Sequence, residues 1–122
     1  RILDVCNKFP NLVRTPIVSS SDLHAFYKFY TYIKPEGLKS DYTRDRILQD
    51  LNKSGVPAFT GSCSEIYLES AFYNTAFKPK ARLPIAKQLG ETSLVFLVHP
   101  TLSEDDMSAM TDIIEKVFKD AS

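Results

Sequence analysis

The sequence has 122 residues, 43% of them hydrophobic, which suits one domain with a real core and is too short for two. Its 15 basic and 15 acidic residues cancel, so it shows neither the basic footprint of a nucleic-acid-binding protein nor a polybasic membrane signal. The two cysteines, Cys6 and Cys63, have no spacing typical of a disulfide framework or a zinc site, so we expect a reduced, cytoplasmic protein without a metal.

Residues 1 to 9 predict the end of a helix, because apolar residues recur there at helical spacing and Pro10 stops the pattern. The chain begins at Arg1 without a capping residue, as if it entered partway through that helix. We therefore expect a fragment of something longer. An exposed apolar face favours self-association, and we expect incomplete packing for three residues of this helix: Ile2, Val5 and Phe9.

The stretch from Ala25 to Ile33, AFYKFYTYI, is the strongest strand signal, since aromatic and β-branched residues fit a pleated, half-buried surface. The extended connection before it, over residues 10 to 22, predicts a short edge strand at 12–14. Lys28 lies among aromatics and can snorkel to solvent, cover a ring or meet an anion; the first is favoured because buried lysine is rare. Alternation predicts a core face of Tyr27, Phe29, Thr31 and Ile33 and an amphipathic face of Phe26, Lys28, Tyr30 and Tyr32.

After a turn at 35–37, Ser40 or Asp41 is positioned to cap a helix that runs to about Lys53. Gly55 suits the end of that helix, where a positive φ costs glycine little. A short strand over 56–60 follows, and its proline predicts an edge position or a strand start.

The polar loop over 61–65 leads to a turn or two of helix within 66–73 and an irregular stretch over 74–82. A short helix is predicted from Leu83-Pro84 to Leu89, with Gly90 as its stop. The strand over 92–98 is apolar enough to be central, and its run of five apolar residues is too short to span a membrane.

The last helix is predicted to begin at Ser103, where Asp106 resembles the partner in a capping box. These elements predict an α+β domain: a small, mainly antiparallel sheet of three or four strands with helices packed on one face. A helix connects the strand over 25–33 to that over 56–60, so a parallel relation between those two strands stays open.

The search for catalytic motifs finds no phosphate-binding glycine loop, paired-histidine metal spacing or nucleophile elbow. For His24 and His99 we favour structural hydrogen bonds at strand ends, and for Cys63 an inert thiol. Glu65 becomes a candidate acid or base only if its loop lines a cleft. The residues by themselves indicate a soluble accessory or binding module. A stand-alone α+β ligand-binding or regulatory module without enzymatic activity therefore stays open as an alternative.

Three segments in succession, HAFYKFYTYI, GVPAFTGSCSEIYLESAF and LPIAKQLGETSLVFLVHPTLSEDDM, resemble the C-terminal small domain of the DegT/DnrJ/EryC1/StrS aminotransferases. The resemblance covers essentially the whole chain. It implies a single small domain over 1–122, with 1–9 as the helix that enters from a large domain. That large domain would carry pyridoxal phosphate and its Schiff-base lysine, so this chain would hold no catalytic residue and no cofactor.

The resemblance also implies that the parent enzyme transfers an amino group to a nucleotide-linked keto-sugar and forms a homodimer. Family members often carry a histidine after the glycine that ends the helix, and this chain has none after Gly55. The substrate contact is then expected from the polar loop, although Ser64 as a mere helix cap is an equally strong interpretation. The candidate substrate-binding residues are Ser62, Ser64, Glu65, Lys28 and His24.

Overall fold

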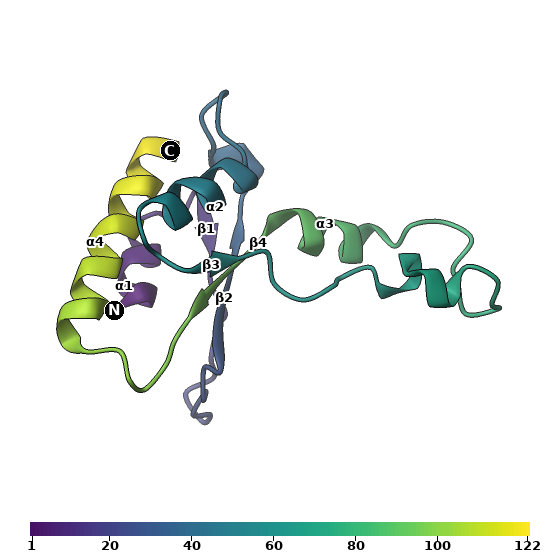
Figure 1. Ribbon diagram of the computed structural model, residues 1–122, viewed down its shortest axis with the longest axis horizontal. Coiled ribbons are helices and arrows are strands. Elements are labelled where there is room, and N and C mark those ends of the chain that lie inside the picture. The colour runs from purple at the N-terminus through teal and green to yellow at the C-terminus, as the bar shows by residue number, and fades with distance from the viewer.

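Four strands form one sheet in the computed structural model, which describes residues 1–122 (Figure 1). They are β1 (Val13–Arg14), β2 (Lys28–Ile33), β3 (Ala58–Phe59) and β4 (Ser93–Leu97), in the order β1-β2-β4-β3. Every neighbouring pair is antiparallel, which confirms the predicted fold class. β2 and β3 point the same way but do not pair, because β4 lies between them and is antiparallel to both.

Three helices cover one face of this sheet: α1 (Ile2–Asn7), α2 (Arg44–Lys53) and α4 (Glu104–Ala121) (Figure 1). The core lies between them and the sheet, where Phe29, Leu94, Phe96 and Phe118 are buried. The expectation that α1 lacks full packing is wrong. Ile2 and Val5 are buried, and the Phe9 ring meets Phe118 edge-on at 5.8 Å, because α4 lies along α1 within the chain itself.

The helix ends follow local side-chain chemistry. The capping box of α4 is confirmed, with Ser103 and Asp106 bonded reciprocally. The cap of α2 differs from the prediction of Ser40 or Asp41. Thr43 accepts from the Arg46 N–H at 3.1 Å, while the Asp41 carboxylate pairs with the Arg46 guanidinium at 2.6 Å. The first helical turn therefore begins two or three residues later than expected.

β2 begins at Lys28 rather than Ala25, and the cause is Phe26. Its φ of +44° breaks the extended backbone, so strand alternation does not reach that far. The Phe26 side chain packs against the core, whereas Tyr27, predicted to face the core, is exposed. From Lys28 onward the alternation holds, with Phe29, Thr31 and Ile33 buried.

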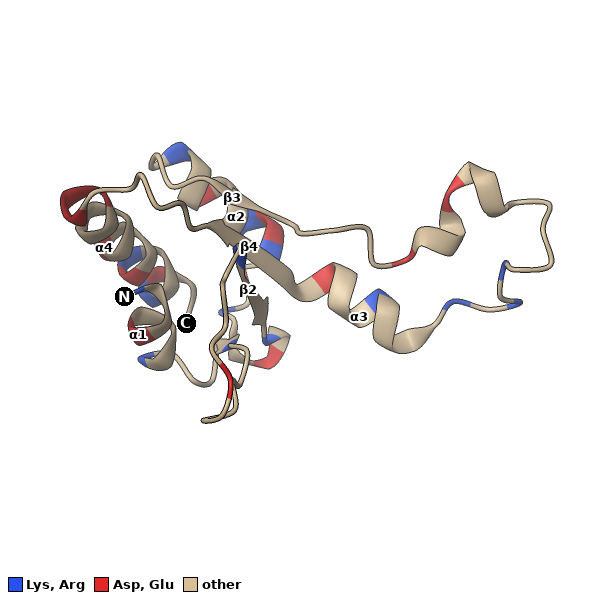
Figure 2. Ribbon diagram, turned by 90° about the horizontal axis from the view of Figure 1, so that it is seen from below, with Lys and Arg blue, Asp and Glu red and all other residues tan.

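The segment from residue 60 to residue 92, here called the arm, projects from the helix-free face of the sheet (Figures 1 and 2). It contains two 3₁₀ turns, Ile66–Leu68 and Ser70–Phe72, and the helix α3 (Pro84–Thr92). Gly90 was predicted to end α3, but it lies inside that helix. None of the helices has the length and apolar character needed to cross a membrane.

Candidate functional site

The polar loop at the start of the arm lies directly on the helix-free face of the sheet. A side-chain Cβ at Gly61 would come within 2.9 Å of a Tyr30 ring carbon and 3.3 Å of Val95 Cγ2. Gly61 also has a φ of +92°, which L side chains rarely adopt. Both the backbone conformation and the lack of space therefore require glycine at position 61. Its close approach helps bury Val95 on the sheet face that no helix covers.

Ser62 is fixed to β2 by two hydrogen bonds. Its N–H donates to the Tyr30 hydroxyl at 3.2 Å, and its own hydroxyl shares a hydrogen bond with that group at 2.8 Å. Just before Gly61, the Thr60 carbonyl accepts a hydrogen bond from the Ser93 hydroxyl of β4. The loop is thus anchored through polar side chains of the inner strands, and Ser62 stays exposed on its outer side.

Ser64 packs against α3. A Cβ at Gly90 would clash with the Ser64 side chain, so only glycine fits at this position of the helix. The interpretation of Ser64 as a helix cap is wrong, because the following 3₁₀ turn has Glu65 at its N-terminus and no side-chain cap bond.

Glu65 is the centre of a polar cluster that connects residues 65–67 of the arm with residues 82–83. Its carboxylate accepts from both Arg82 Nε, at 2.9 Å, and Arg82 Nη2, and from the Tyr67 hydroxyl at 2.6 Å. The Tyr67 oxygen in turn accepts from the Leu83 N–H at 2.9 Å. We call these four residues, Glu65, Tyr67, Arg82 and Leu83, the Glu65 cluster.

The electrostatics of this cluster define what Glu65 can do. The hydrogen bonds from Arg82, and then from Tyr67, lower the pKa of Glu65 to about 2. Burial and the hydrogen bond to Glu65 raise the pKa of Tyr67. Glu65 is therefore a carboxylate at neutral pH and holds no proton to donate as a general acid.

The remaining candidates lie away from this loop. Lys28 is exposed on β2, as favoured from the sequence. Its ammonium lies 5.6 Å from the centre of the Tyr27 ring, within range of a cation–π contact. His24 accepts from the Phe26 N–H at 2.8 Å and stacks on that ring at 4.0 Å. His99 bonds locally to Thr101. Ser62, Ser64 and Glu65 are neighbours in sequence, but each contacts a different segment: Ser62 contacts β2, Ser64 contacts α3, and Glu65 contacts Arg82 and Tyr67. Lys28 and His24 have other, local contacts.

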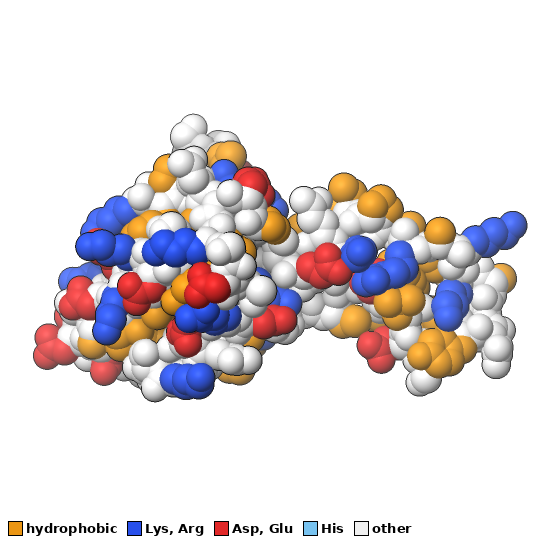
Figure 3. Space-filling model, turned by 90° about the horizontal axis from the view of Figure 1, so that it is seen from above, with side chains coloured by type: hydrophobic (Ala, Val, Ile, Leu, Met, Phe, Trp, Pro, Cys, Tyr) orange, Lys and Arg blue, Asp and Glu red, His pale blue; other side chains and the backbone are white.

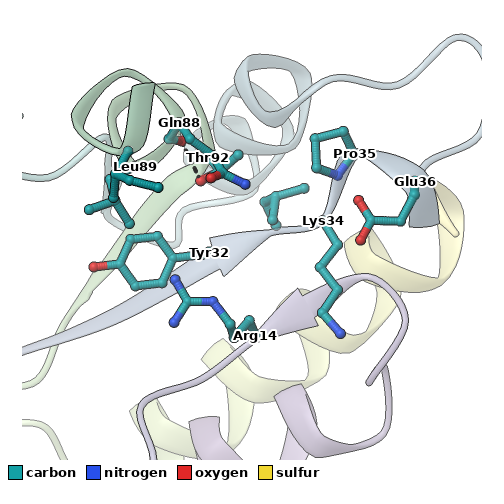
Figure 4. A pocket seen from close by; sticks show the side chains of 10 residues that line it. Arg14, Tyr32, Lys34, Pro35, Glu36, Gln88, Leu89 and Thr92 are labelled. Atoms are coloured by element: carbon teal, nitrogen blue, oxygen red, sulfur yellow. Dashed lines mark hydrogen bonds between the residues drawn. The ribbon is translucent and has the colours of Figure 1, made fainter. Parts of the chain in front are cut away.

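A pocket of about 340 Å³ opens where α3 leaves the sheet (Figure 4). Arg14 and Tyr32 form its floor, with the guanidinium 4.2 Å from the ring centre, and Gln88 and Leu89 close it from α3. The sequence analysis missed this pocket, because its walls come from β1, β2 and α3. The polar face of β2, which includes Tyr32, was the only signal that pointed to it.

The pocket does not fit pyridoxal phosphate. Its one lysine, Lys34, already donates to the Pro10 carbonyl at 2.7 Å, and its one aromatic ring, Tyr32, is covered by Arg14. The lysine and the aromatic ring of this pocket are thus both engaged by other groups of the chain. No group of three His, Cys, Asp or Glu residues is placed to hold a metal ion.

Comparison with known proteins assigns this fold. No family model and no curated protein matches the chain, but solved structures do. The aminotransferase from Psychrobacter cryohalolentis is 47% identical over 98% of this chain, with a TM-score of 0.91. A DegT DnrJ EryC1 StrS aminotransferase from Brucella abortus is 19% identical over 94%, with a TM-score of 0.70. The sugar aminotransferase CalS13 from Micromonospora echinospora is 15% identical over 95%, with a TM-score of 0.67.

These matches confirm the resemblance found in the sequence. The chain spans only part of each structure: 32% of the Psychrobacter chain, 28% of the Brucella chain and 30% of the Micromonospora chain. The matched region is therefore about a third of an aminotransferase, which agrees with a small domain.

Proposed function

We propose that this chain, which has the fold of the small domain of the DegT/DnrJ/EryC1/StrS aminotransferases, is the C-terminal domain of a pyridoxal-phosphate-dependent enzyme that aminates a nucleotide-linked keto-sugar. The observation that carries the proposal is the 47% identity over 98% of the chain with an aminotransferase of which it spans 32%. Residues 1–9 are then the entry from a large domain, and that domain holds the cofactor, which supplies the electron sink for transamination.

The contribution of this domain is to bind and orient the sugar at the edge of the cleft. The exposed side of the loop offers the Ser62 hydroxyl as a donor or acceptor for a sugar hydroxyl. Glu65, held as a carboxylate by Arg82, offers its remaining acceptor capacity and sets the position of the loop. Ser64 fixes the loop against α3.

The test uses the full-length parent enzyme with pyridoxal phosphate, an amino donor and a nucleotide-linked keto-sugar, and detects the amino-sugar by mass spectrometry. We expect Glu65→Gln and Ser62→Ala to keep the cofactor absorbance and to lower kcat/KM for the sugar. Glu69→Gln is the matched control, because Glu69 is exposed in the same arm and its carboxylate accepts one hydrogen bond, from the Cys63 thiol.

An unchanged kcat/KM in both Glu65→Gln and Ser62→Ala would make the loop purely structural, with Lys28 and His24 the next candidates. The 122-residue chain alone is expected neither to bind pyridoxal phosphate nor to transaminate. A borohydride-reducible adduct at one specific lysine of that chain would contradict this expectation. Product formation without pyridoxal phosphate would overturn the proposed function itself.

A further inference from the structure

The pocket floored by Arg14 and Tyr32 contains two opposite charges that the chain leaves unpaired. The positive one is Arg14, which lies directly across from Tyr32 in the ladder of β1 and β2. Its guanidinium lies over the Tyr32 ring at 4.2 Å, and no oxygen of the chain accepts a hydrogen bond from its N–H groups. Stacking covers the face of a guanidinium and leaves its N–H edge available, so this edge can receive a ligand.

Glu36 supplies the negative charge. It lies in the 3₁₀ turn Pro35–Gly37 that follows β2, and its carboxylate forms no ion pair within the chain. Figure 4 shows Arg14 and Tyr32 on one side of the pocket and Glu36 on the other. Lys34 lies next to Glu36 in sequence, but its ammonium donates to the Pro10 carbonyl. The pocket therefore presents a cation and an anion at separate positions.

Apolar side chains form much of the remaining wall. Ile85 and Leu89 come from α3, and Ile33 and Pro35 come from β2 and the turn after it. Ile85 is 65% exposed, and the space-filling view shows apolar side chains uncovered along the arm (Figure 3). The volume of about 340 Å³ is at the lower end of the range for small-molecule sites. The walls and the volume thus suit a small ligand with an apolar part.

We propose that this pocket binds a free amino acid with an apolar side chain. The carboxylate of the amino acid pairs with the N–H edge of Arg14, in the fork geometry that guanidinium groups favour. Its ammonium is held by Glu36, and its side chain packs against Ile85 and Leu89. A phosphate dianion fits less well because Glu36 repels it, and a plain amine leaves Arg14 without an acceptor. This binding does not depend on the function proposed for the parent enzyme.

An amino acid in this pocket contacts two parts of the domain at once. Arg14 and Glu36 belong to the sheet and its following turn, whereas Ile85 and Leu89 belong to α3. The bound ligand therefore restrains α3 against the sheet. Slower amide hydrogen exchange over residues 84–92 is the local sign of this restraint, and it distinguishes the pocket from any other place where an amino acid binds.

Isothermal titration calorimetry of the 122-residue chain tests the site with three probes of similar size. L-Leucine carries both charges, isocaproate carries only the carboxylate, and isoamylamine carries only the ammonium. We expect leucine to bind about tenfold or more tightly than either single-charge probe, since each lost contact is a charge-assisted hydrogen bond. The 122-residue chain is suitable because its core is complete without further segments.

Two variants assign the two charges. Arg14→Gln and Glu36→Gln are each expected to weaken leucine binding by about tenfold or more. Arg14→Gln should remove the preference for leucine over isoamylamine, and Glu36→Gln the preference for leucine over isocaproate. Both residues are exposed, so the urea midpoint should change little. Lys53→Gln and Asp112→Asn are the matched controls, because they neutralise exposed charges on α2 and α4 and should leave the affinity unchanged.

Hydrogen–deuterium exchange then locates the site in the full-length parent. We expect leucine to slow exchange over residues 84–92 in the wild type and not in Arg14→Gln. The proposal is overturned by equal binding of the three probes, by unchanged affinity in Arg14→Gln, or by no protection of α3 in the parent. Displacement of leucine by an equal concentration of inorganic phosphate would assign the pocket to a phosphate instead. A parent without transaminase activity but with leucine-dependent protection of α3 would refute the proposed function and leave this site intact.

Discussion

Replacing Gly61 with alanine tests whether the polar loop is pressed onto the sheet. The substitution places a β-carbon 2.9 Å from the Tyr30 ring, closer than real Cβ contacts allow, on a backbone with a φ of +92°. A left-handed conformation costs an L residue about 1–2 kcal/mol by itself. Relieving the clash shifts the loop away from β2 and weakens the hydrogen bonds between Ser62 and Tyr30, a further loss of about 1 kcal/mol.

Moving the loop also uncovers Val95, which is 1% exposed. Full exposure of such a side chain costs about 1.5–3 kcal/mol, and partial exposure costs about 1 kcal/mol. The sum for Gly61→Ala is a destabilisation of about 3–4 kcal/mol. Urea denaturation of the 122-residue chain at neutral pH, followed by circular dichroism, measures the free energy of unfolding.

Gly55→Ala is the matched control for the backbone effect alone. Gly55 has a φ of +88°, but a Cβ there meets nothing within 4 Å. Its expected cost is therefore only the left-handed term of about 1–2 kcal/mol. Equal destabilisation by Gly61→Ala and Gly55→Ala would refute the reasoning, since it would show that the loop moves away from Tyr30 and Val95 without loss.

Two other predictions concern the arm. The pKa of Glu65 lies at about 2 in the folded chain against 4.5 ordinarily, so its stabilising contribution is complete above about pH 4.5 and disappears as the pH falls towards 2. Urea midpoints measured between pH 6 and pH 2 should fall more steeply for the wild type than for Glu65→Gln; parallel curves would contradict the Arg82 pairing. Gly90→Ala in a Ser64→Ala background should stabilise the chain by about 0.5–1 kcal/mol, because only an ordinary contact with the Cβ of residue 64 remains and alanine favours the helix. Destabilisation in that background would show that something other than Ser64 requires the glycine.

Local chemistry in the sequence was sufficient for most of the helical layer and for the identity of the strands. The Ser103–Asp106 capping box of α4 is a short-range pattern, and it was predicted as observed. The edge positions of β1 and β3 also follow from local signals, since Pro57 cannot donate to a ladder at the start of β3. The same local signals predicted a mainly antiparallel sheet, and the family resemblance added its identification as a small domain, which the solved structures support.

Long-range geometry decided the rest. Nothing near Glu65 in the sequence announces Arg82, because the two are brought together by the path of the arm between them. Tyr30 and Ser62 are likewise far apart in sequence, so the sequence offered the loop's hydroxyls but not their anchor. From the sequence Gly90 is predicted to end a helix, and only the structure shows that the nearby Ser64 side chain requires a glycine there. Periodicity and capping act within a few residues and can be predicted from the sequence. The partner of a half-buried carboxylate such as Glu65, or the neighbour of a closely packed glycine, depends on which distant segment the fold places there.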